Sequence, residues 1–112
     1  NLRRLEIFIE SSQNSFLVKY MSNNYIAISS LAMDLKRIAL AYHNGSDETA
    51  EIFIIEANKR KAEIDKKLVK PYLLTHIDSL DKVFGRSDKL HLAEDALTYS
   101  QIFQNYALAF EN

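Results

Sequence analysis

The most extended amphipathic pattern in the chain runs from Asn24 to His43. Wound as a helix at about 100° per residue, it carries one broad apolar face, a separate apolar stripe and a narrow polar arc. A helix that is apolar over so much of its circumference must be covered on more than one side, so this segment is predicted to be the centre of a helical bundle. The broad face consists of Tyr25, Ile28, Leu31, Leu35, Ile38 and Tyr42, with Ala32 and Ala39 between them, and the separate stripe consists of Ile26, Met33 and Leu40.

The segment before it, residues 2–21, can be read in two ways. Helical spacing aligns its apolar residues on one face, whereas the stretches LEIFIE and SFLVKY around SSQN have the β-branched and aromatic residues of a hairpin. An isolated hairpin has little stability, and the chain offers no third strand to support one. The sequence therefore favours a helix here.

Turn and capping residues divide the chain into elements. Ser22 to Asn24 supply turn and N-cap chemistry, and Asn44-Gly45 allows the positive φ that ends a helix. Pro71 stops or begins a helix, and Gly85 ends the next one. The pattern predicts an all-α, up-and-down bundle of four to five helices in a single domain, residues 1–112, with helices at about 2–21, 24–43, 47–69, 71–84 and 88–110.

The composition agrees with this fold class and excludes several kinds of function. The 112 residues include 2 Gly, 1 Pro and no Cys, and the formal net charge is −1. So few turn residues favour helices over strands. Without cysteine there is no disulfide, thiolate metal site or thiol nucleophile, which fits a cytoplasmic protein. No apolar run is long enough for a membrane span, and we expect no membrane partner.

Repeated apolar stripes off the main helix faces are the strongest sign of a partner surface. They occur on the first and last predicted helices, and Ile52 and Ile55 add a smaller one on the third. A compact bundle could cover such stripes itself; otherwise they mark an interface, and a homodimer is the simplest one. The candidate interface residues are Leu90, Leu97, Leu108, Ile7, Val18 and Met21.

His91 and Asp95, four residues apart, share one edge of the last predicted helix. Such a pair could supply two metal ligands, or an imidazole held by a carboxylate for proton transfer. A local hydrogen-bonded pair is the alternative. The Glu-x-x-His motifs of helical di-iron bundles are lacking, so no metal and no cofactor are predicted.

The segment from Arg37 to His43 resembles the Arg-x(4–6)-His motif of HEPN-domain RNases, which are small dimeric helical bundles. The resemblance covers these two residues, and Ile38 stands where that family often has a polar residue. It implies an RNase that uses Arg37 and His43 for cleavage. On a straight helix the two side chains lie about 240° apart, so they converge only if the helix ends before His43.

Nucleic-acid binding is not expected from the charge pattern. The basic residues between Lys59 and Lys70 are interspersed with Glu63 and Asp65 and preceded by Glu56, so no continuous basic face forms. The two glycines stand far apart, which excludes a glycine-rich phosphate loop.

The sequence therefore predicts a non-enzymatic protein that acts by protein–protein contact, as a regulator or adaptor. Its expected partners are a second copy of the chain and another protein. The alternatives are a HEPN-like RNase and a helical carrier of a small ligand or metal.

Overall fold

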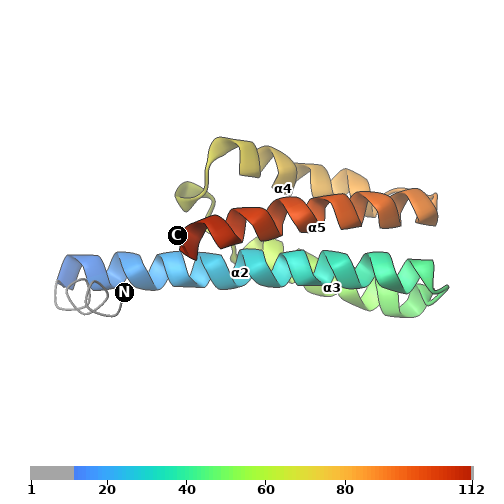
Figure 1. The fold of residues 1–112 in the computed structure, drawn as a ribbon, viewed down its shortest axis with the longest axis horizontal. Coiled ribbons are helices and arrows are strands. Elements are labelled where there is room, and N and C mark those ends of the chain that lie inside the picture. The colour runs from blue at the N-terminus through green and yellow to red at the C-terminus, as the bar shows by residue number, and fades with distance from the viewer. Residues whose placement is uncertain (1–11, 112) are drawn as a thin grey trace.

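The structure is a computed structural model that describes residues 12–111, and side chains from residue 23 to residue 109. Within this part the chain is an up-and-down bundle of α-helices, as the sequence predicts (Figure 1). The bundle is elongated, with extents of 50 × 23 × 20 Å. Its elements are α2 (Ser12–His43), α3 (Asp47–Glu63), a 3-10 turn (Lys66–Leu68), α4 (Pro71–Phe84) and α5 (Lys89–Glu111).

Helix α2 is the centre of the bundle. It packs against both α3 and α5, and α4 lies along α5 (Figure 1). Its side chains at Ile28, Leu31, Leu35 and Ile38 are fully buried, which confirms the broad apolar face as the core surface of this helix. Every large side chain on that face removes apolar area from water, and this burial is the main source of stability for such a fold.

The break predicted between residues 21 and 24 is wrong, because α2 is one continuous helix from Ser12 to His43. Ser22 and Asn24 were expected to turn the chain or cap a helix. Asn24 instead directs its buried side chain to the backbone of Asp65, far away in the sequence. With its amide occupied there, it does not compete for the local helix hydrogen bonds. The segment SFLVKY is helical, which contradicts the hairpin alternative, and residues 2–11 lie outside the described residues.

The predicted helix over 47–69 is too long. Helix α3 ends at Glu63, and Ile64 is extended, with φ −74° and ψ 123°. Ile64 and Val69 turn their side chains into the core, and Lys70 is extended before Pro71, as a residue preceding proline prefers. Core burial and the proline thus replace the last six residues of the predicted helix with a short connection that contains the 3-10 turn.

The other boundaries agree with the sequence. Helix α4 spans Pro71–Phe84 and α5 spans Lys89–Glu111, within one residue of the predictions. Gly45 has a φ of 74° in the turn after α2, a conformation that glycine adopts without strain. Among the described helices, none has the length and apolar character needed to cross a membrane.

Candidate functional site

The outer side of the α2–α5 pair carries an apolar surface that no other helix of residues 12–111 covers. On α2, Ile26, Met33 and Leu40 are 57%, 53% and 53% exposed. On α5, Leu97 and Leu108 are 41% and 48% exposed. The stripe on α2 follows from a seven-residue spacing, which returns to nearly the same direction after two helical turns. We call these five residues the α2/α5 face.

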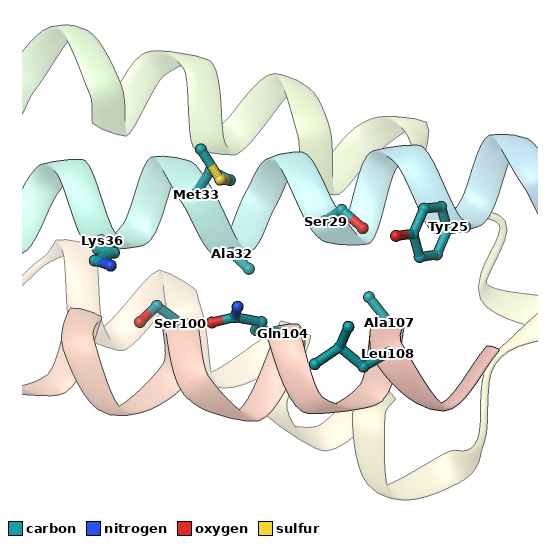
Figure 2. A pocket seen from close by; sticks show the side chains of 9 residues that line it. All are labelled: Tyr25, Ser29, Ala32, Met33, Lys36, Ser100, Gln104, Ala107 and Leu108. Carbon is teal, nitrogen blue, oxygen red and sulfur yellow. The ribbon is translucent and has the colours of Figure 1, made fainter. Parts of the chain in front are cut away.

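A groove of about 190 Å³ lies between the two helices and opens on this face. Small side chains line it, with Ser29 and Ala32 on α2 opposite Ser100 and Ala107 on α5 (Figure 2). Because these side chains are short, they leave the space between the helices unfilled. Met33 and Leu108 belong to the same lining, so the groove meets the α2/α5 face at these two residues.

The remaining interface candidates lie beyond this face or are not described. Leu90, 62% exposed, lies in the first turn of α5, seven residues before Leu97 and therefore on the same side of the helix. Val18 and Met21 lie in the part of α2 whose side chains the structure does not describe. Ile7 lies outside the described residues.

The sequence drew attention to Leu90, Leu97 and Leu108 but did not place the α2 stripe among the interface candidates. The seven-residue repeat of Ile26, Met33 and Leu40 was the signal available for it. The groove itself had no such signal, because it depends on which small residues of two separate helices face each other.

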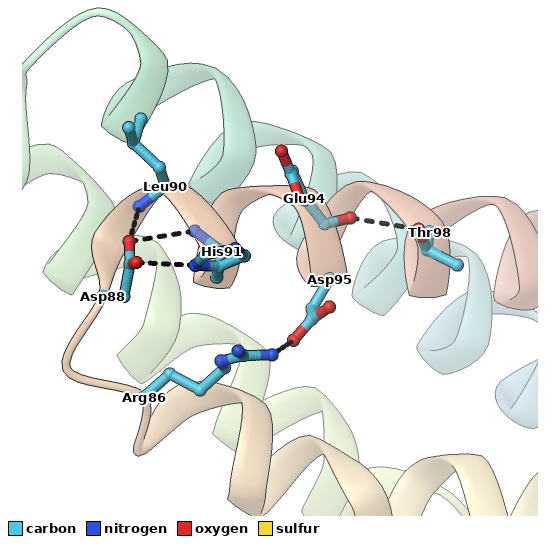
Figure 3. A network of polar contacts seen from close by, with 7 residues as sticks. All are labelled: Arg86, Asp88, Leu90, His91, Glu94, Asp95 and Thr98. Atoms are coloured by element: carbon cyan, nitrogen blue, oxygen red, sulfur yellow. Dashed lines mark hydrogen bonds and ion pairs between the residues drawn. The ribbon is translucent and has the colours of Figure 1, made fainter.

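His91 and Asp95 have different partners, and the structure does not join them (Figure 3). His91 Nδ1 lies 2.6 Å from Asp88 Oδ2, and Arg86 donates to Asp95 Oδ2 at 2.6 Å. Asp88 Oδ1 also accepts from the backbone N–H groups of Leu90 and His91, which makes it the N-cap of α5. The hydrogen bonds from His91 hold the pKa of Asp88 below its ordinary value. This cluster is thus organised around the start of a helix.

Arg37 and His43 point to different sides of α2. The helix continues to His43, so the early end that would bring the two side chains together does not occur. Arg37 forms an ion pair with Asp34 at 3.3 Å, and its guanidinium lies 5.5 Å from the centre of the Phe53 ring. His43 is exposed at the end of the helix.

Asp34 is the one carboxylate among the buried residues of the described core. Its side chain is only 7% exposed, and within the described residues Oδ2 has no hydrogen-bond partner. Burial raises the pKa of Asp34, and the nearby guanidinium groups of Arg37 and Arg60 oppose this only in part. The group is buried between α2 and α3, away from the groove.

Aromatic side chains occupy the α4–α5 side of the bundle. The His76 ring lies edge-on between Tyr72 and Tyr99, at centroid distances of 6.3 and 5.6 Å. Tyr106 contacts Tyr72 in the same way, and its hydroxyl accepts from the backbone N–H of Lys70. In the described part of the chain, no group of three or more His, Cys, Asp or Glu side chains is placed to hold a metal ion.

Comparisons with protein-family models, with curated proteins and with solved structures found no match for this chain.

Proposed function

We propose that the protein acts by binding protein, without catalysis, and that the α2/α5 face is the surface it uses. The observation that carries this proposal is the row of large apolar side chains that stay about half exposed around a groove. The bundle could have covered the separate stripe of α2 with another helix, yet α4 packs on α5 and leaves the stripe open. Contiguous apolar surface of this kind is typical of interaction sites.

The residues that surround the α2/α5 face are those expected around a protein-binding surface. Its rim is polar: Ser29, Gln101 and Gln104 are the uncharged residues near it, and Lys36, Arg37 and Glu94 are the charged ones. An apolar centre with a polar rim is the usual anatomy of a protein interface. The proposed setting is the cytoplasm, to which the cysteine-free sequence is suited.

The test compares a charge placed inside the face with the same charge placed outside it. Met33→Glu and Leu97→Glu put a carboxylate at the centre and at one end of the face. Ile52→Glu is the matched control, because Ile52 is 58% exposed on α3, outside the face. Circular dichroism checks that all three variants keep their helicity.

Association is then measured by light scattering for self-association and by affinity capture with tagged protein for other partners. We expect association that both face variants lose and Ile52→Glu keeps. Association that survives both face variants would overturn the proposal. A chain that binds neither itself nor any captured protein would overturn it as well.

A further inference from the structure

We infer that the partner on the α2/α5 face is a second copy of the chain, related to the first by a two-fold axis that crosses the helices at the level of Met33. This inference rests on the proposed function, since it names the partner of the same surface. It is carried by the positions of the exposed apolar residues along the two helices.

The side-by-side positions on α2 and α5 are fixed by the lining of the groove. The two helices run in opposite directions, and Lys36 lies beside Ser100 while Ser29 lies beside Ala107 (Figures 1 and 2). Each step forward along α5 is therefore a step back along α2. It follows that Leu97 lies at the level of Leu40, and Leu108 lies between the levels of Ile26 and Ser29.

The five residues of the α2/α5 face thus form two outer clusters on either side of Met33, and Leu90 lies beyond them at the start of α5. One cluster is Ile26 with Leu108, the other is Leu40 with Leu97, and their members lie about five to seven residues, or roughly 8–10 Å, from Met33. A surface that binds a copy of itself through a two-fold axis must present matching groups at equal distances on either side of that axis. The α2/α5 face has this property about Met33.

The axis brings apolar groups onto apolar groups all along the face. Met33 meets its own copy, Ile26 meets Leu40 of the other copy, and Leu97 meets Leu108 of the other copy. Helix α2 then packs antiparallel on α2, and α5 antiparallel on α5.

The same register places Gln101 opposite Gln104 of the other copy, where side-chain amides can donate to and accept from each other. Lys36 faces the serines at 29 and 30, so this lysine does not meet a like charge. A two-fold axis parallel to the helices would instead put α2 on α5 and set Met33 against Gln104. The perpendicular axis is preferred because it keeps this central methionine in an apolar contact.

The size of the face fits a weak, reversible dimer. Its outer clusters are about 21 Å apart along the helices, and the bundle is 20–23 Å across. These lengths give a face of roughly 400–500 Å² per copy, below the roughly 600 Å² that each partner contributes at the lower end of a stable, specific interface. We therefore expect a weak, reversible dimer that is seen only at high micromolar concentration.

Single cysteines test the arrangement directly, because the chain has none of its own. A residue on the axis meets itself, so Met33→Cys should form a disulfide-linked dimer under mild oxidation. Ile26→Cys and Leu40→Cys should each stay largely uncrosslinked alone and form a mixed disulfide when combined. Ile52→Cys, equally exposed but outside the face, is the control and should not crosslink.

The possible results separate this inference from the proposed function. If the wild-type protein is monomeric at several hundred micromolar, the inference that the partner is a second copy is wrong. The face would then bind only a different protein. A dimer that Met33→Glu abolishes, but that Met33→Cys does not crosslink, overturns the axis while the proposed function stands. A dimer that Met33→Glu and Leu97→Glu leave intact overturns both.

Discussion

Asn24 holds the backbone of Asp65, 41 residues away, by both ends of its side-chain amide. Its Nδ2 donates to the carbonyl oxygen of Asp65 at 3.0 Å, and its Oδ1 accepts from the backbone N–H at 2.8 Å. Asn24 is only 2% exposed, so its side chain is shielded from water, whereas Asp65 is partly exposed. This pair of bonds fixes the connection between α3 and α4 against the central helix.

Replacing Asn24 with alanine should destabilise the bundle strongly. The substitution leaves the N–H and the carbonyl of Asp65 without their partner, and each unpaired, partly buried group costs about 1–3 kcal/mol. We expect the free energy of unfolding to fall by about 2–4 kcal/mol, measured by urea denaturation. The neighbouring Asn23 is exposed, so Asn23→Ala should change the free energy of unfolding by less than about 0.5 kcal/mol. Equal effects of the two substitutions would show that these bonds do not stabilise the fold.

The period of apolar residues predicted the fold class, the core face of α2 and the bounds of α4 and α5. These features depend on local spacing, which the sequence contains in full. The role of Asn24 was missed because asparagine is typical of turns and caps, and its distant partner cannot be read from neighbouring residues. The end of α3 was missed for a similar reason, since the burial of Ile64 and Val69 is decided by tertiary packing.

For the candidate site, too, the sequence predicts features that depend on local spacing and misses those that depend on the packing of separate segments. The exposure of Leu97 and Leu108 could be anticipated, because each lies off the main face of its own helix. The alignment of Leu97 with Leu40 could not, because it depends on the register between two helices. The partner of Asp95 also escaped prediction, since Arg86 reaches it from the loop before α5.

Removing the charge of Asp34 should stabilise the protein at neutral pH. Because the pKa of Asp34 is raised in the folded chain, ionisation costs the folded state more than the unfolded state. The free energy of unfolding therefore falls as the pH rises from the ordinary aspartate range through the folded-state pKa, and the penalty is complete above it. Asp34→Asn keeps the shape and an acceptor for Arg37 but carries no charge.

We expect a higher melting temperature for Asp34→Asn than for the wild type at pH 7, and a smaller difference near pH 3. Scanning calorimetry at both pH values measures this. Asp78→Asn changes an exposed carboxylate and is the control, with little effect expected. A lower melting temperature for Asp34→Asn at pH 7 would mean that the ion pair with Arg37 outweighs the cost of burial.

Asp88 should stabilise the start of α5 in a way that acid removes. Its pKa is lowered in the folded chain, so its contribution is complete above the ordinary aspartate pKa and is lost as the pH falls through the folded-state value. Asp88→Ala should lower the melting temperature at pH 7 and matter less at pH 2. Asp88→Asn keeps an N-cap oxygen, so at pH 7 its melting temperature should lie between those of the wild type and Asp88→Ala. If alanine and asparagine behave alike, the cap does not act through its side-chain oxygen.

The melting temperature itself should depend on protein concentration if the α2/α5 face binds a second copy. A dimer that dissociates on unfolding is stabilised by mass action, so raising the concentration raises the melting temperature. We expect an upward shift for the wild type between about 5 and 500 µM, a similar shift for Ile52→Glu and none for Met33→Glu. Met33 is 53% exposed in the single chain, so the glutamate costs little there and is buried only in the dimer. A wild-type melting temperature that stays constant over this range would contradict self-association, whereas a shift that persists in Met33→Glu would place the contact on another surface.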